Sequence, residues 1–397
     1  MPSPATFRSM KVFHHDYAYL DSGAPDSNNY TTWVILHGMG FNGGLFLQLL
    51  QRTTGMVTRT FRDAAVFEKL FPLAYAHNLR IVSVNRRGYS PSSGFQESEL
   101  KGMGHGNTTE EAEPFFRSQG VEIATFLAQF ATEQDIPLAK AGSTGGVVLI
   151  GWSLGTIHAI AVLAFADELP EDTRSTLQKY LHTILAHGKA PDSLIPWSTF
   201  DPLLDTNTST LGMPAPERSQ MGLGLWLEPD DRKRFDAFFY SVTAHYVHKS
   251  VTSGNIDDLE FDKPSDIPHS LRELSYEQRG KYTNLEPFSF TGCDGKLLCC
   301  ELPVLAVIVR RALFNTALAA RLPNVRVRYM SSGTSGAVLI WPLWVLQWHL
   351  EDPKGLYGPD AEKARDIKTI NQTEGNHFVF WEDPEKAIQQ YSASIDL

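Results

Sequence analysis

Cysteine is scarce in this chain: only Cys293, Cys299 and Cys300 occur among its 397 residues. An odd number of cysteines, two of them adjacent, fits neither a disulfide framework nor a zinc site. The sequence also lacks an apolar run of the roughly 18 residues that a membrane-spanning helix needs. Residues 1–8 contain no apolar stretch typical of a signal peptide. We therefore expect a cytoplasmic protein.

Basic residues are outnumbered by acidic residues, and no basic run offsets this imbalance. Lysine and arginine total 35 against 45 aspartates and glutamates, which gives a net charge of −10. This charge argues against nucleic acid and other polyanions as partners. The chain is 42% hydrophobic and 20% charged, as in ordinary globular proteins, and its length allows one large domain with an insertion or two domains.

The most informative motif is the pentapeptide GWSLG at residues 151–155. An apolar segment precedes it at 147–150, and residues 156–166 have the composition of a buried helix. Strand, sharp turn and helix form the context in which G-x-S-x-G makes a nucleophile elbow. The turn strains the serine backbone, and a large residue two positions away on either side would clash. This explains why both of these positions are glycine. The pattern predicts an enzyme with Ser153 as its nucleophile.

Strand and helix patterns alternate between residues 30 and 190. The expected strands cover residues 32–36, 80–84, 147–150 and 181–186, and the expected helices cover 60–77, 109–134 and 156–166. After an interruption, a helix is expected at 302–322 and strands at 325–329 and 367–370. This alternation predicts an α/β protein with a mostly parallel sheet flanked by helices.

Residues 188–300 interrupt the alternation with loop signals, and one amphipathic helix is expected in them, at 230–249. That helix is rich in aromatic residues, namely Phe235, Phe238, Phe239, Tyr240 and Tyr246. An insertion after the carboxyl end of a strand lies over the edge where open α/β sheets bind ligands. We therefore predict a core of residues 1–187 and 301–397 and a largely helical lid of residues 188–300.

A serine hydroxyl needs a neighbouring base to act as a nucleophile at neutral pH. His377 lies in the segment after the last expected strand and is the candidate base. An oxyanion hole is built from backbone N–H groups. The glycine-rich segment after the first expected strand suits close approach to a reacting carbonyl. We expect the donors to be the N–H groups of Met39, in that segment, and of Leu154.

The same segment, Gly38–Gly43, also matches G-x-G-x-x-G, the fingerprint of dinucleotide binding. That alternative needs an acidic residue at the end of the next strand, about 20 residues on, to hold a ribose. Here the next convincing strand ends much later, at Asn85, and is followed by Arg86 and Arg87. We therefore favour the oxyanion hole.

Taken together, these motifs resemble the α/β-hydrolase superfamily. The similar segments, in the family's order, are the His37-Gly38 loop, residues 85–90 (NRRGYS, similar to the family's D-x-R-G-x-G-x-S), the Ser153 elbow and Asn376-His377-Phe378. Within the family, the long expected lid and the N-H-F-x-x-W ending are most like fungal members linked to secondary metabolism. The resemblance implies an α/β-hydrolase fold that needs no cofactor or metal.

The sequence departs from the family's pattern at the catalytic acid. The family places an Asp or Glu after the strand that corresponds to 325–329 or to 181–186. Residues 330–336 (MSSGTSG) contain no acid, and Asp192 is the first carboxylate after the other strand. Asp192 is therefore the candidate acid, and a Ser–His dyad or a degenerate site stays open. Remoter alternatives are Asp201, Glu351 and Asp352.

The resemblance implies a serine hydrolase that cleaves an ester, lactone or thioester through an acyl-enzyme. The aromatic residues of the expected lid favour an apolar small-molecule substrate of polyketide or terpenoid size. A serine at the elbow disfavours epoxide hydrolases and dehalogenases, whose covalent chemistry needs a carboxylate nucleophile. The alternative function is a fold that binds a small molecule without hydrolysing it, or that steers a non-hydrolytic rearrangement.

Overall fold

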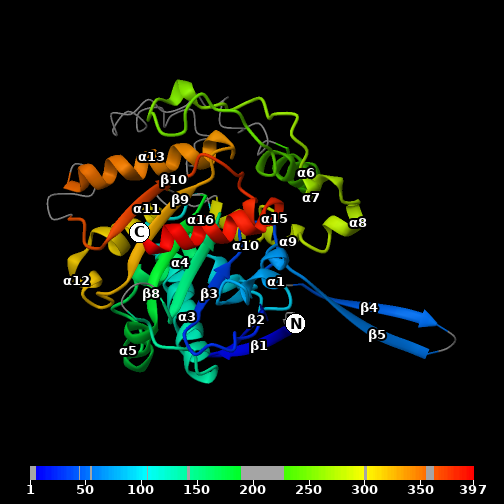
Figure 1. Ribbon diagram of the computed structural model, residues 1–397, viewed down its shortest axis with the longest axis horizontal. Coiled ribbons are helices and arrows are strands. Elements are labelled where there is room, and N and C mark those ends of the chain that lie inside the picture. The colour runs from blue at the N-terminus through cyan, green and yellow to red at the C-terminus, as the bar shows by residue number, and fades with distance from the viewer. Residues whose placement is uncertain are drawn as a thin grey trace.

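A central eight-stranded sheet organises the protein (Figure 1). The computed structural model describes residues 6–43, 45–53, 56–104, 106–140, 144–188, 228–298, 302–354 and 362–397. The strand order is β1-β2-β6-β3-β7-β8-β9-β10; β1 pairs antiparallel with β2, β2 pairs antiparallel with β6, and the remaining pairs are parallel. The strands are β1 (Thr6–Val12), β2 (His15–Asp21), β3 (Thr31–Leu36), β6 (Leu79–Val84), β7 (Val147–Trp152), β8 (Leu181–His187), β9 (Arg326–Ser331) and β10 (Ile367–Asn371). The predicted α/β class with a mostly parallel sheet is confirmed.

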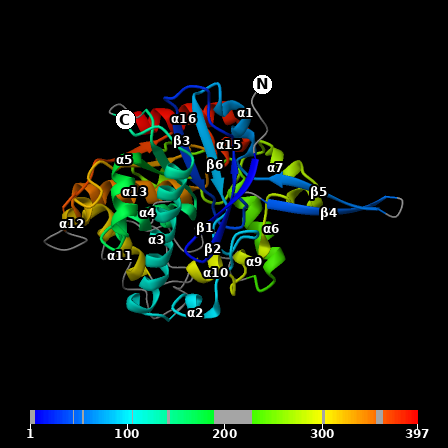
Figure 2. The ribbon, with the colours of Figure 1, turned by 90° about the horizontal axis from the view of Figure 1, so that it is seen from below.

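Helices cover both faces of this sheet (Figure 2). One layer contains α3 (Thr109–Glu133), α4 (Gly155–Ala164) and α11 (Leu302–Phe314), and the other contains α1 (Phe71–Ala74), α15 (Val379–Glu382) and α16 (Pro384–Asp396). Successive side chains of a strand point to opposite faces. In β3, Val34 and Leu36 accordingly pack with the first layer, whereas Trp33 and Ile35 pack with the second. Burial on both faces explains the apolar runs in the central strands β3 and β7.

The prediction of a helix at residues 60–77 is wrong. Strands β4 (Leu45–Thr53) and β5 (Met56–Ala64) pair antiparallel as a hairpin that extends away from the body of the protein (Figures 1 and 2). Only short helices follow, η1 (Glu68–Leu70) and α1. Residues 60–64 belong to a strand because β5 pairs with β4 along its whole length, from Met56 to Ala64.

Two other helices are shorter than expected because polar residues end or restart them. The helix expected at 230–249 ends at Val242, and Thr243 Oγ1 then donates to the carbonyl of Phe239 at 2.6 Å. The helix expected at 302–322 divides into α11 and α12 (Thr316–Ala319), because the Asn315 side chain caps α12 by accepting from Leu318 N–H. Within the described ranges, no helix is long and apolar enough to cross a membrane.

Residues 228–298, called here the helical segment, lie beside the loop that follows β3. The amide of Asn284 donates to the Gly40 carbonyl at 2.9 Å, and Phe41 forms a β-bridge with Thr283. The segment contains α6 (Asp231–Val242), η6 (Ile256–Asp258), α7 (Ser270–Glu273), α8 (Tyr276–Arg279), α9 (Leu285–Phe288) and α10 (Cys293–Leu298). The described residues also form the helices α2 (Glu97–Leu100), α5 (Glu171–Tyr180) and α13 (Ala337–Glu351).

Candidate active site

Ser153 lies at the sharp turn between β7 and α4. Its φ of 53° places a non-glycine residue in the left-handed region, which is a strained conformation. A Cβ on Gly151 would lie 2.6 Å from the Cα of Thr156, and a Cβ on Gly155 would lie 2.3 Å from the Leu36 carbonyl oxygen. Both glycines of the motif are therefore required by close backbone contacts, and the predicted strand–turn–helix geometry is confirmed.

His377 is buried beside this turn, with 1% of its surface exposed. The indole Nε1 of Trp152 donates to the His377 carbonyl at 2.9 Å, and the two rings lie 5.0 Å apart between centroids. Gly188, the residue after β8, lies against the imidazole: a Cβ there would be 2.4 Å from Cε1 and 2.5 Å from Nδ1. The structure thus brings His377 to the carboxyl ends of β7 and β8, where Ser153 also lies.

The contact with Gly188 predicts a specific way to displace the imidazole. In Gly188→Ala, the new methyl group would overlap the His377 ring, so we expect kcat for a model ester to fall by about 100-fold or more. Gly23→Ala is the matched control, because Gly23 has a similar φ (80° against 86°) but no atom within 4 Å of an added Cβ. Both variants should lose comparable stability from backbone strain. Equal kcat values in the two variants would contradict the prediction.

The two segments that carry the predicted oxyanion donors adjoin Ser153. The loop after β3 passes so close to the turn that a Cβ on Gly38 would lie 2.7 Å from the Cβ of Ser153. The next residue, Met39, is buried, and Leu154 is the N-cap of α4. Amides at a helix N-terminus and in a glycine-containing loop are suited to hold a developing negative charge.

The dinucleotide alternative for Gly38–Gly43 is not supported, because strand β4 comes next in the chain where that motif requires the start of a helix. The glycine at the end of the motif serves packing instead: a Cβ on Gly43 would lie 2.3 Å from the Val84 carbonyl oxygen. At the end of the next parallel strand, Asn85 Oδ1 accepts from the Gly43 amide at 2.9 Å. This side chain therefore holds the loop rather than a ribose.

Asp192, the candidate acid, lies outside the described residues, as does Asp201, so this assignment stays a prediction. The remoter alternatives Glu351 and Asp352 are exposed at the end of α13 and do not share the buried surroundings of His377. The position after β9, one of the two places where the resemblance implies an acid, holds Ser332, whose Oγ lies 2.8 Å from His187 Nε2.

His187 is a site residue to which no sequence pattern pointed. Its Nδ1 lies 2.8 Å from the Tyr391 hydroxyl, its Nε2 binds Ser332, and its ring centroid lies 5.7 Å from that of His377. Burial lowers the pKa of His187 to about 3, so the ring is neutral at physiological pH. A neutral ring held at both nitrogens fills the space beside His377 without adding a charge.

The buried neutral histidines predict acid lability. Burial also lowers the pKa of His182 to about 4 and that of His269 to about 3. An unfolded histidine takes up its proton near pH 6.5, so stability is complete above that pH and is lost as the pH falls toward 3. We expect His187 alone to cost about 2 kcal/mol of unfolding free energy between pH 7.5 and 5.

Chemical denaturation at these two pH values measures this loss. A His187→Asn variant, which cannot take up the proton, should be less stable at pH 7.5 but should lose less stability on acidification. An equal loss in wild type and variant would refute the contribution of His187.

Aromatic side chains form a wall beside the candidate oxyanion loop. Phe41 contacts Trp152, Phe239 and Phe378, with ring centroids 5.6, 5.9 and 4.9 Å away. Phe235 of α6 covers Gly40 so closely that a Cβ there would lie 2.7 Å from its Cε2. The helical segment therefore presents apolar surface next to the loop that carries Met39.

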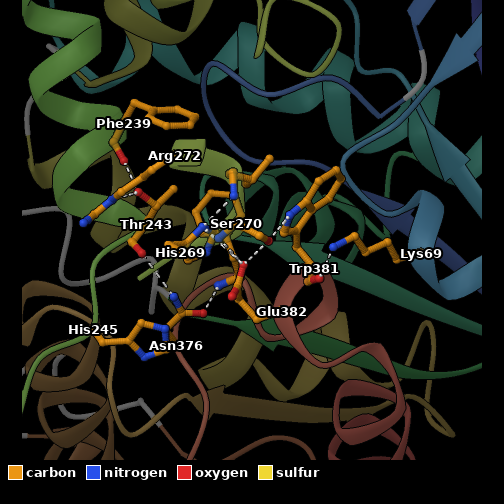
Figure 3. Close-up of polar contacts among 12 residues, drawn as sticks. Lys69, Phe239, Thr243, His245, His269, Ser270, Arg272, Asn376, Trp381 and Glu382 are labelled. Atoms are coloured by element: carbon orange, nitrogen blue, oxygen red, sulfur yellow. Dashed lines mark hydrogen bonds and ion pairs between the residues drawn. The ribbon is translucent and has the colours of Figure 1, made fainter. Parts of the chain in front are cut away.

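The helical segment also holds the loop that carries His377, as Figure 3 shows. Asn376 Nδ2 donates to the Thr243 carbonyl at 3.3 Å, while its Oδ1 accepts from the Phe378 amide at 2.9 Å. Later in the chain than His377, Trp381 and Glu382 contact the same segment. Ser270 Oγ donates to Glu382 Oε1 at 2.7 Å and accepts from the Trp381 indole at 2.9 Å. Residues on both sides of His377 are thus tied to the same segment.

Comparisons with known proteins found similar solved structures and one matching family. Similar solved structures include a mutant of epoxide hydrolase from Solanum tuberosum (11% identity, 98% of each chain covered, TM-score 0.51). An epoxide hydrolase from Vigna radiata (13% identity, 99% of this chain and 98% of that chain, TM-score 0.48) and a bromoperoxidase from Bacillus anthracis (13%, 99% and 100%, 0.45) are also similar. No curated protein sequence matches this chain significantly. Residues 33–390 match the family described as "Alpha/beta hydrolase family", and the chain therefore belongs to the alpha/beta hydrolases.

Proposed function

We propose that this alpha/beta hydrolase is a serine hydrolase that cleaves an ester, lactone or thioester of an apolar small molecule. The observation that carries the proposal is the left-handed Ser153 between β7 and α4, with His377 buried beside the same turn. A serine presented in this way is the nucleophile of an acyl-transfer reaction. It is not the carboxylate nucleophile that opens epoxides or displaces halide.

The proposed reaction has two halves. Ser153 Oγ attacks the carbonyl carbon while His377 accepts its proton, and the N–H groups of Met39 and Leu154 bind the oxygen that becomes negative. His377 then protonates the leaving alcohol or thiol, which leaves an acyl-enzyme. Water, deprotonated by His377, attacks the acyl carbon, and the acid product leaves as Ser153 regains its proton. Asp192 is the proposed residue that orients the imidazole.

The substrate class follows from the aromatic wall. We propose that residues 188–300 form a lid over a core of residues 1–187 and 301–397. The described part of this lid places Phe235 against Gly40, next to the proposed oxyanion hole. Such a wall favours an apolar acyl or alcohol group. A size typical of polyketides or terpenoids rests on the aromatic residues expected in this lid, and a role in fungal secondary metabolism rests on the sequence resemblance.

A second candidate function is binding, or a rearrangement without hydrolysis. It is favoured by Ser332, a serine instead of an acid after β9. Orientation of the imidazole by an acid is worth roughly ten-thousand-fold in kcat in a well-studied protease, so its loss would leave a weak hydrolase.

A fluorophosphonate probe distinguishes the two functions, because it reacts only with an activated serine. We expect covalent labelling of the wild-type protein, mapped to the peptide that contains Ser153, and hydrolysis of p-nitrophenyl esters that improves with acyl length. A folded protein that neither takes the label nor hydrolyses the esters would favour the binding function.

A further inference from the structure

A buried ion pair joins the helical segment to the proposed oxyanion hole. We propose that Arg86 and Asp294 are positioning residues that fix the direction of the Met39 N–H, a role that rests on the proposed serine hydrolase function. Arg86 follows β6, and Asp294 belongs to α10 of the helical segment. Both residues act on the oxyanion hole indirectly, through the peptide between Gly38 and Met39.

The pair is bidentate and almost completely enclosed. Arg86 NH1 donates to Asp294 Oδ1 at 3.0 Å, and NH2 donates to Oδ2 at 2.7 Å. The side chains of Arg86 and Asp294 are 3% and 2% exposed. Burial by itself would lower the pKa of Arg86, but the Asp294 carboxylate outweighs this effect and raises it, so the guanidinium stays charged. Fork-to-fork geometry of this kind fixes orientation as well as charge.

The remaining donors of Arg86 hold the backbone of the oxyanion loop. Its Nε donates to the His37 carbonyl at 2.8 Å, and NH2 donates to the Gly38 carbonyl at 3.2 Å. The Arg86 amide also donates to His37 Nε2 at 3.1 Å, so that nitrogen is an acceptor and the proton of the neutral ring is on Nδ1. His37 Nδ1–H then donates to the Gly38 carbonyl at 2.8 Å.

Two donors therefore fix the carbonyl of Gly38 on the side of Arg86. In a planar trans peptide the N–H points opposite to the preceding C=O. The Met39 N–H must then point away from Arg86 and His37. Gly38 itself lies against Ser153, as the 2.7 Å approach of an added Cβ shows. Rotating this peptide would turn the donor away from the reacting carbonyl.

Tyr89 provides a second connection between Asp294 and the same loop. Its hydroxyl donates to Asp294 Oδ2 at 2.5 Å and accepts from the Gly40 amide at 2.7 Å. The peptides on both sides of Met39 are thus held by groups that converge on one carboxylate. Arg86 NH1 also donates to Nε2 of His158 on α4, at 2.9 Å, which joins the network to the helix that follows Ser153.

The test compares Asp294→Asn with Asp21→Asn. Asp21 forms an equally buried bidentate pair with Arg80, at 3.0 and 2.6 Å, where the amino end of β6 meets β2. Each variant leaves one buried arginine without its full partner, so both should lose stability. Removing one oxyanion donor costs about 10²–10³ in kcat. In Asp294→Asn the donor is misdirected rather than removed. We therefore expect kcat to fall by about 10- to 100-fold, with KM nearly unchanged.

The decisive second readout is inhibition by an apolar trifluoromethyl ketone, which forms a hemiketal oxyanion on the serine. Its Ki should rise in Asp294→Asn by about the same factor as kcat/KM falls, because both measure binding of the oxyanion. The pH profile should not move, since the base is untouched. Asp21→Asn should retain the wild-type kcat and Ki.

Each outcome decides the proposal. Equal kcat values in Asp294→Asn and Asp21→Asn, or a lower kcat with an unchanged Ki, would overturn the positioning role. If Asp294→Asn does not fold, Tyr89→Phe gives the answer, because it removes one link to the loop and should raise Ki and lower kcat together by several-fold. A wild-type protein without label or ester turnover would refute the proposed function itself, and the positioning role with it.

Discussion

Replacing Ser153 with alanine should abolish ester turnover, with kcat lowered by at least about 10⁴-fold and the fold retained. The hydroxyl is needed only to form the covalent bond. Alanine keeps the Cβ and the same left-handed backbone, so the strain at φ 53° is present in both proteins. Residual turnover should be limited to what binding and the oxyanion hole contribute without a nucleophile. Steady-state kinetics, with a thermal unfolding scan to verify folding, measures both quantities.

Ser118→Ala is the matched control. Ser118 is half-buried, as Ser153 is, but lies on α3, where its hydroxyl donates to the Phe115 carbonyl. Both variants lose one oxygen atom, yet only Ser153→Ala should lose activity and fluorophosphonate labelling. Full activity in folded Ser153→Ala would refute the acyl-enzyme and favour the binding alternative.

The elbow could be predicted from the sequence because its geometry is local. The two glycines are required by backbone atoms of neighbouring segments, and the flanking apolar runs encode the strand and the helix. The location of His377 near this elbow could be predicted from its place after the last strand. Positions fixed by chain order and short-range sterics are the ones that a sequence pattern records.

The positioning network could not be predicted in the same way. Arg86 and Asp294 are 208 residues apart in the chain, and no sequence pattern predicts that they form an ion pair. The resemblance pointed to the turn that contains Arg86 but gave it no partner. The place of His187 in the site could not be predicted either, because the sequence of an apolar strand does not show whether the ring nitrogens of a histidine in it form hydrogen bonds.

The prediction of secondary structure was wrong where contacts between distant segments determine the structure. Residues 60–64 belong to β5 because β4 pairs with them, and a partner strand lies outside any local pattern. Beyond the end of the helix at Val242, the Tyr246 amide donates to the Thr334 carbonyl and Tyr246 forms a β-bridge with Pro264, and neither partner lies within a local pattern. Propensity sets a preference, and contacts of the fold override it.

His377→Ala should be about as damaging to kcat as Ser153→Ala, and the double variant should be little worse than either. Base and nucleophile act as one unit, so removing the second after the first removes nothing more. The variant should also lose about 2 kcal/mol of stability, because the imidazole packs against Trp152 and Gly188 in a buried site.

His182→Ala separates this catalytic loss from the loss of stability. His182 is also buried, but it lies at the amino end of β8, whereas Gly188 follows the carboxyl end. It should lose comparable stability and keep the wild-type kcat. A complete cycle of single and double variants, assayed on one ester, then measures the coupling between Ser153 and His377. Losses that multiply would show that His377 is not the base for Ser153, because two groups that act in one proton transfer cannot be removed independently.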